Sequence, residues 1–304
     1  MFNILDNITE WIKEILISAI IHSLSSMFGD VNEKVGTIAE EVGQTPQGWN
    51  NGIFTMIQNL SETVILPIAA IIITYVLCAE LIGMVIDKNS MHDIDTFMFF
   101  KYLFKACVAV LIVSNTFVIT MAVFDVAQHI VSGAAGVING ETAIDIDATI
   151  ADMKGDLENI GIPELLLLTL ETFIVSFCLK IMSVIITVIL YGRMIEIYCA
   201  CSAAPIPFAT FTNNEWGQMG NNYLRALLAL GFQGFLLMVC VGIYAVIVND
   251  MIVADNIHSA IFSLASYTVL LCFAMLKSGA LAKSILNAQC SMLINSHFEL
   301  RIKS

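Results

Sequence analysis

The stretch Arg193–Arg225, RMIEIYCACSAAPIPFATFTNNEWGQMGNNYLR, lies between two strongly apolar segments and decides how often the chain crosses a membrane. Its first half contains more Ile, Ala and Phe than a soluble loop would. It also contains a candidate ion pair, two closely spaced prolines and a run of amides, which an ordinary membrane span would avoid. We therefore interpret the stretch as a folded elbow at the surface of a membrane protein.

The composition supports this interpretation. Of 304 residues, 58% are hydrophobic and only 13% are charged, whereas soluble domains have about 25% charged residues. The net charge of −13 disfavours nucleic acid as a stable surface partner, because neutralising phosphates requires clustered Lys and Arg. The eight cysteines imply neither a disulfide framework nor a metal site, since Cys199 and Cys201 lack the spacing of zinc ligands and have no nearby His.

The N-terminal part is expected to lie outside the membrane domain. Residues 1–28 have apolar side chains at three- and four-residue spacing, which predicts an amphipathic helix in the membrane interface or packed on its own bundle. Residues 29–62 are polar and are expected to form a connector. Residues 1–56 contain seven acids and two lysines. We expect residues 1–62 to form an external N-terminal amphipathic helix and polar connector.

The remainder, residues 63–304, is expected to be a membrane domain with five spans. Each expected span has enough apolar residues to cross about 30 Å of hydrocarbon at 1.5 Å per residue. The expected spans are 64–86, 103–124, 163–191, 226–248 and 257–276. An external acidic loop, residues 125–164, contains eight acids and one lysine. The predicted fold class is therefore an all-α polytopic membrane protein with about five transmembrane helices plus an N-terminal amphipathic helix.

The basic residues predict the orientation. Nine of the thirteen Lys and Arg residues fall in 87–105, in the elbow 193–225 or near the C-terminus, and short cytoplasmic loops are enriched in these residues. This places the elbow and the C-terminus in the cytoplasm and the N-terminus outside the cytoplasmic (inner) membrane. In the alternative, residues 194–211 form a sixth span, which would put Arg225 and the final basic tail on opposite sides.

Within the elbow, Arg193 and Glu196 are one turn apart and are expected to pair. Pro205 and Pro207 predict that the preceding helix ends near Ala203 and that Ile206 is extended. The alternative is a polar connector that merely turns the chain. The candidate assembly residues of the elbow are Arg193, Glu196, Pro205, Pro207, Asn214, Glu215 and Arg225.

Four polar side chains fall inside or near the end of expected spans, where such groups usually have a function. They are Glu80, Glu171, Lys180 and Gln233. Glu80 could instead reach the interface. Glu171 and Lys180 are nine residues apart and cannot pair on one helix, so a central one requires a partner on another helix or a wet lumen.

Several motifs together resemble those of a known family. The runs R-x-x-E-I-Y, A-A-P-I-P-F-A-T-F, N-x-E and N-Y-L-R, followed by F-Q-G, resemble the TrbL/VirB-type polytopic membrane subunit of type IV secretion systems. The similarity is best over residues 191–248 and is greatest to the version in conjugative elements of Gram-positive bacteria. The resemblance implies a channel component that helps to move DNA or protein. It further implies homo-oligomers that work beside secretion ATPases and other membrane subunits, with transient contact to the cargo.

The sequence contains no catalytic motif of the P-loop, HExxH or GxSxG type, so we expect no enzyme activity, no cofactor and no small-molecule substrate. Two alternatives to a secretion channel stay open. One is a small-solute transporter or permease, in which the four intramembrane polar residues would line a site. The other is a non-conducting membrane scaffold.

Overall fold

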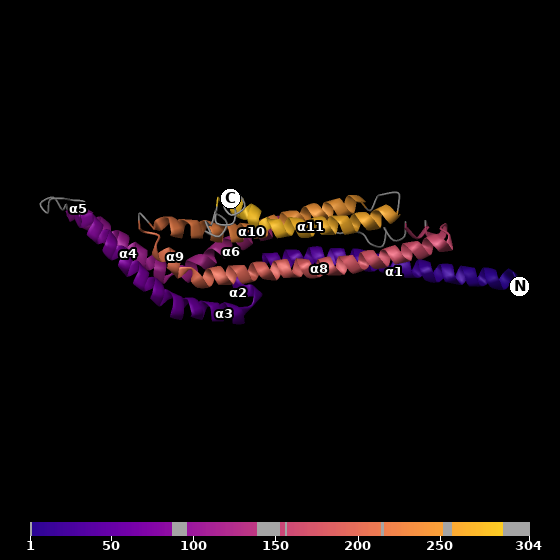
Figure 1. Ribbon diagram of the computed structural model, residues 1–304, viewed down its shortest axis with the longest axis horizontal. Helices are drawn as coiled ribbons and strands as arrows, with labels where there is room; N and C mark the ends of the chain where they lie inside the picture. The colour runs from indigo at the N-terminus through magenta and orange to yellow at the C-terminus, as the bar shows by residue number, and fades with distance from the viewer. Residues whose placement is uncertain are drawn as a thin grey trace, which may run out of the picture. The chain divides into compact units, whose positions relative to one another are not determined.

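A computed structural model describes residues 2–86, 96–138, 153–155, 157–213, 216–251 and 257–287. Within these ranges the chain is helical and contains no strand, so the predicted all-α class is confirmed. The helices are α1 (Phe2–Gly43), α2 (Pro46–Trp49), α3 (Asn51–Leu60), the π-helical turn η1 (Ser61–Ile65), α4 (Leu66–Ile86), α5 (Thr96–Ser114), α6 (Thr116–Ile138), α8 (Ile162–Ala203), α9 (Pro205–Ala209), α10 (Gly217–Met251) and α11 (Ile257–Ile285) (Figure 1).

Apolar side chains cover much of the helix surface. Ile71, Phe104 and Phe173 are 72%, 72% and 70% exposed, which indicates contact with lipid rather than water. Seven helices in the described part of the chain are long and apolar enough to cross a membrane. The chain is therefore a multi-pass membrane protein.

The seven helices exceed the five expected spans for two reasons. Asn7–Gly43 of α1 is itself long and apolar enough to span a membrane. The expected span 103–124 is divided between two such helices, Phe97–Ser114 and Thr116–Ile138. At the division, Asn115 Nδ2 donates to the Leu111 carbonyl at 2.8 Å and Thr116 Oγ1 donates to the Val113 carbonyl at 2.8 Å. Short polar side chains that bond to the preceding turn bend helices. The expected span 103–124 therefore lies across an irregularity that its apolar composition did not indicate.

Contacts divide the chain into two compact units. The first unit comprises residues 1–43, 130–192 and 234–278, and the second comprises 44–129, 193–233 and 279–304. The first unit has one core, to which α1, α8, α10 and α11 contribute Leu24, Leu168, Leu237 and Leu264 among others. The second unit has two smaller cores. In it, α9 packs against both α4 and α5.

α1 differs from its expected form. It continues without a break to Gly43, through residues that we expected to belong to a polar connector. The reason is its apolar face, which runs on at helical spacing and is buried in the first unit's core. The buried residues of this face are Ile17, Ile20, Leu24, Met27, Phe28, Val31, Val35, Ile38 and Val42.

In the first unit, α1 lies along α8, and the two helices run in the same direction (Figure 1). The hydroxyls of Ser23 and Ser176 are 3.1 Å apart, and Lys34 Nζ donates to Thr187 Oγ1 at 3.4 Å. The second pair lies eleven residues after the first on both helices, which requires parallel packing. Residues of α1 and α8 at these pairs are therefore at the same depth of the bundle.

Candidate functional site

The elbow consists of the last turns of α8, the short helix α9 and the first turns of α10, all in the second unit. α8 ends at Ala203, which confirms the end that the prolines predicted. The expectation that Ile206 is extended is wrong, because Pro205–Ala209 is helical. Pro205 and Pro207 fit because N–H groups in the first turn of a helix have no acceptor within the helix. The six-span alternative is also disfavoured, since α8 is continuous from Ile162 and leaves no turn before residue 194.

A close backbone approach folds α10 back onto α9. A Cβ at Gly220 would lie 2.8 Å from the Pro207 carbonyl oxygen and 2.9 Å from Cδ2 of Phe211, so only glycine fits there. The rings of Phe208 and Tyr223 meet edge to face with centroids 6.1 Å apart, and the Tyr223 hydroxyl donates to the Ala200 carbonyl. These contacts fix the geometry of the elbow.

A second contact attaches the α2 turn to α8. The Tyr198 hydroxyl donates to the Pro46 carbonyl at 2.5 Å. The ring centroids of Trp49 and Tyr198 are 6.0 Å apart. Sequence reasoning missed this contact because Pro46 and Tyr198 are far apart in the chain. The elbow is thus a packed structure rather than a simple connector.

The expected ion pair of Arg193 with Glu196 is wrong. Glu196 instead accepts a hydrogen bond from Lys283 of α11, with Nζ and Oε1 3.0 Å apart. Arg193 is only 7% exposed, and its Nε has no hydrogen-bond partner among the described residues. The arginine shares a helix face with the buried Ile197, whereas Glu196 points to the exposed side, where Lys283 lies.

The other elbow residues are less informative. Pro205 and Pro207 are both buried, and Arg225 is exposed on α10. Asn214 and Glu215 lie outside the described residues. Next to them, the ring of Trp216 stacks on Tyr75 of α4 with centroids 5.8 Å apart.

Three of the four intramembrane polar residues contact another helix of their own unit. Glu80 of α4 forms an ion pair with Lys105 of α5. Glu171 of α8 has His258 of α11 as its partner, with Oε2 and Nδ1 2.5 Å apart. Gln233 of α10 is buried beside Gly279 of α11. A Cβ added at Gly279 would lie 3.2 Å from the side-chain nitrogen Nε2 of Gln233. Each polar group inside an apolar bundle is thus placed against a neighbouring helix.

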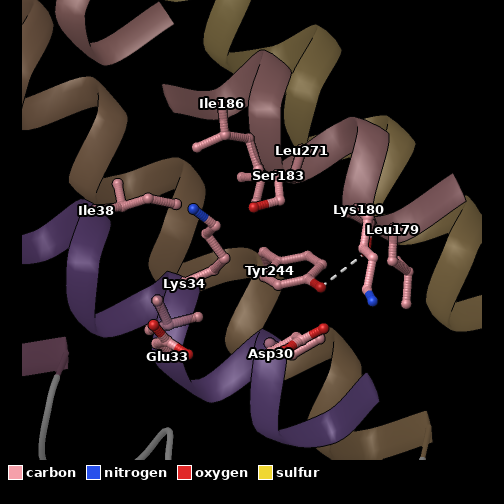
Figure 2. A pocket seen from close by; sticks show the side chains of 13 residues that line it. Asp30, Glu33, Lys34, Ile38, Leu179, Lys180, Ser183, Ile186, Tyr244 and Leu271 are labelled. Carbon is pink, nitrogen blue, oxygen red and sulfur yellow. Dashed lines mark hydrogen bonds between the residues drawn. The ribbon is translucent and has the colours of Figure 1, made fainter. Parts of the chain in front are cut away.

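The fourth, Lys180, lines a cavity of about 310 Å³ in the first unit. We call this the α1–α8 cavity. It is lined by Asp30, Val31, Glu33, Lys34, Val35 and Ile38 of α1, Leu179, Lys180, Ser183 and Ile186 of α8, Tyr244 of α10, and Thr268 and Leu271 of α11. In Figure 2, Tyr244 lies between Lys34 and Lys180. The hydroxyls of Tyr244 and Thr268, 2.9 Å apart, belong to its polar lining.

Sequence reasoning missed the contribution of α1 to this cavity. Asp30, Glu33 and Lys34 were assigned to a polar connector, yet they project from a continuous helix. The signal that could have found them is the apolar spacing of the intervening residues Val31, Val35 and Ile38, which continues the pattern of the preceding turns. Four charged side chains therefore share one cavity, and the pattern of expected spans predicts only Lys180 among them.

The chemistry of these sites is that of binding and hydration. Among the described residues, no three His, Cys, Asp or Glu side chains are arranged to hold a metal ion. The α1–α8 cavity combines two carboxylates, two ammonium groups and three hydroxyls. Such a lining can hold water or a small polar molecule.

Comparison with protein families gives one match. The model of the TrbL/VirB6 plasmid conjugal transfer like protein family matches residues 31–205, more than half of the chain. This range includes the first three expected spans in full, which lie outside the region of best resemblance, and only the first part of residues 191–248. Neither the curated proteins nor the solved structures contain a match. The chain belongs to the TrbL/VirB6 plasmid conjugal transfer like protein family.

Proposed function

We propose that this protein is a translocation-channel component of a type IV secretion apparatus that helps to pass DNA or protein across the cytoplasmic membrane. The family match over residues 31–205 is the observation that carries the proposal, because it makes the chain a membrane component of conjugal transfer. The α1–α8 cavity supports a conducting role, since charged groups in a membrane bundle usually mark a polar path. The assignment to Gram-positive conjugative elements rests on the resemblance of residues 191–248.

The proposed orientation has the N-terminus outside and the elbow and C-terminus in the cytoplasm, as the Lys and Arg distribution predicts. The elbow then faces the compartment of the secretion ATPases, which would supply the energy. Homo-oligomers and the other membrane subunits complete the proposed assembly.

Transfer between cells tests the proposed function. Deletion of the gene should reduce conjugative transfer to background, and the intact gene supplied separately should restore it. Transfer at wild-type frequency in the deletion strain would refute a role in the apparatus. Co-purification of the chain with secretion ATPases is the supporting measurement.

We further propose that the elbow is an assembly surface. Glu196→Ala and Pro205→Ala should then reduce incorporation into the apparatus more than insertion into the membrane. Lys283→Ala is the matched control, because it removes the ion-pair partner of Glu196 and leaves the carboxylate exposed. An exposed pair contributes about 0–1 kcal/mol, so folding should be little affected. If Glu196→Ala and Pro205→Ala assemble as well as the Lys283→Ala control, the elbow is not a contact surface.

A small-solute permease is the second candidate, because the volume and mixed charge of the α1–α8 cavity suit a small polar molecule. Solute flux into proteoliposomes that contain this chain alone would favour it. The secretion proposal predicts no such flux, since its channel requires the assembled apparatus.

A further inference from the structure

The outward face of α1 is polar over most of its length. Its exposed residues between Leu16 and Gly43 are Ser18, Ala19, His22, Ser26, Asp30, Glu33, Gly36 and Glu40. They recur at three- and four-residue spacing and so form one stripe, which we call the α1 polar stripe. No large apolar side chain is exposed in this part of α1.

The outward face of α8 at the same depth has the opposite character. The pairs Ser23–Ser176 and Lys34–Thr187 define the shared depth. Around them, the exposed large apolar side chains of α8 are Phe173, Ile174, Phe177, Ile181, Val184 and Val188, and Lys180 is the one charged side chain exposed among them. Such a surface requires lipid at this level of the first unit.

The α1 polar stripe therefore cannot face the same lipid. Asp30 and Glu33 lie close to Lys34, whose partner Thr187 is at the depth of the exposed Val184 and Val188. Carboxylates at membrane depth face a bundle interior or a water-filled space. The α1–α8 cavity, which Asp30 and Glu33 help to line together with Lys180 of α8, offers a space for water at this depth.

We propose that α1 crosses the membrane alongside α8 and that the α1 polar stripe lines an aqueous passage. This inference rests on the proposed channel function and names the helix that forms the wall. It replaces the placement of residues 1–62 outside the membrane.

The charge of the stripe defines what the passage accommodates. Asp30, Glu33 and Glu40 are exposed, whereas Lys34 is half-buried against α8. An acidic wall attracts hydrated cations and does not hold a DNA backbone, which requires Lys and Arg. The α1 polar stripe would repel a polyanionic cargo and offers it no binding site.

Cysteine labelling in cells that contain the whole apparatus tests this inference. Ser18, Ser26 and Glu33 are replaced singly by Cys, and Ile174, Val184 and Val188 of α8 provide matched controls. Intact cells are treated with membrane-impermeant methanethiosulfonates, one cationic and one anionic. Peptide mass spectrometry then distinguishes each new thiol from the natural cysteines.

We expect the α1 thiols to react at least tenfold faster than the α8 thiols. The cationic reagent should be several-fold faster than the anionic one at Ser18→Cys and Ser26→Cys, where the acidic side chains are retained. Equally slow reaction on both helices would overturn the inference, since α1 would then be covered. Equally fast reaction would also overturn it, because this part of the unit would then lie outside the membrane.

The proposed function can fail separately. If deletion abolishes transfer and the α1 thiols stay unreactive, the chain is a secretion component whose passage is lined elsewhere. If the α1 thiols react and deletion leaves transfer unchanged, the passage exists and the secretion role is wrong.

Discussion

α1 and α8 are two helices of 42 residues each that run in parallel, side by side in the first unit. Both bury an apolar face in the same core, yet α8 exposes Phe, Ile and Val where α1 exposes Ser, His, Asp and Glu. Length and overall hydropathy therefore do not identify the surroundings of a membrane helix. The outward face does, and it can be assigned only when the inward face is known.

The largest expected effect comes from reversing the two faces of α1. Leu24 is 1% exposed, so Leu24→Asp places an unpaired charge in the core. An uncompensated buried charge costs about 3–5 kcal/mol. We expect Leu24→Asp to abolish the folded protein, as measured by thermal unfolding in detergent. Ser26→Asp, two residues later on the polar stripe, should change stability by less than about 0.5 kcal/mol. Equal stability of the two variants would mean that the faces are assigned wrongly.

The next effect compares the outward faces directly. Val184 of α8 is 63% exposed. A central Asp costs about 2.5–3.5 kcal/mol in membrane insertion, so Val184→Asp should markedly reduce the inserted protein. Ser26→Asp again serves as the control, and the quantity of membrane-integrated chain is the measurement. Tolerance of both changes would contradict the distinction between the helices.

Lys180 gives α8 a charged side chain at the α1–α8 cavity, as Asp30, Glu33 and Lys34 do for α1. Lys180→Leu removes a charge that opens to the α1–α8 cavity. Insertion should improve by less than the full penalty of a central lysine, about 2.5 kcal/mol, because the cavity hydrates the ammonium group. Transfer frequency should fall while the protein level is kept. Loss of the protein itself would show that Lys180 has a structural role.

The smallest expected effect concerns the contact between the two helices. Ser23→Ala and Ser176→Ala each remove one partner of the interhelical hydrogen bond. Hydrogen bonds between membrane helices contribute about 0.6 kcal/mol on average, so a double-mutant cycle in denaturant unfolding should give a coupling of this size. Zero coupling would indicate that the parallel contact is not formed in the membrane.

An α1 that crosses the membrane alters the count of spans. Residues 125–138, expected to belong to the external acidic loop, are part of α6 instead. If the N-terminus and the chain that follows α6 are both outside, as proposed, and α1 and α6 each cross once, α4 and α5 together must cross an even number of times. Tyr102 of α5 donates to the Leu77 carbonyl of α4 at 2.9 Å, and Lys105 pairs with Glu80, so these helices lie side by side. The antiparallel pair of α4 and α5 gives an even number of crossings whether both helices cross the membrane or neither does.

Sequence reasoning succeeded where one local rule dominates. Apolar composition predicts the all-α membrane fold, and Pro205 predicts the end of α8 at Ala203. It failed where partners distant in the chain decide the outcome. Glu196 forms its ion pair with Lys283 rather than with Arg193. Packing in the core of the first unit stabilises α1 as a helix beyond Asp30 and Glu33. The ion pair leaves no local pattern, whereas the continuation of α1 is marked by the apolar spacing of Val31, Val35 and Ile38.

The most direct test of a secretion passage lined by α1 is conjugative transfer before and after a bulky, membrane-impermeant thiol reagent acts on Ser26→Cys cells. We predict that transfer falls at least tenfold, and that Val184→Cys cells and cells with the unchanged chain transfer as before. Complete labelling of the Ser26→Cys thiol with undiminished transfer would contradict the account.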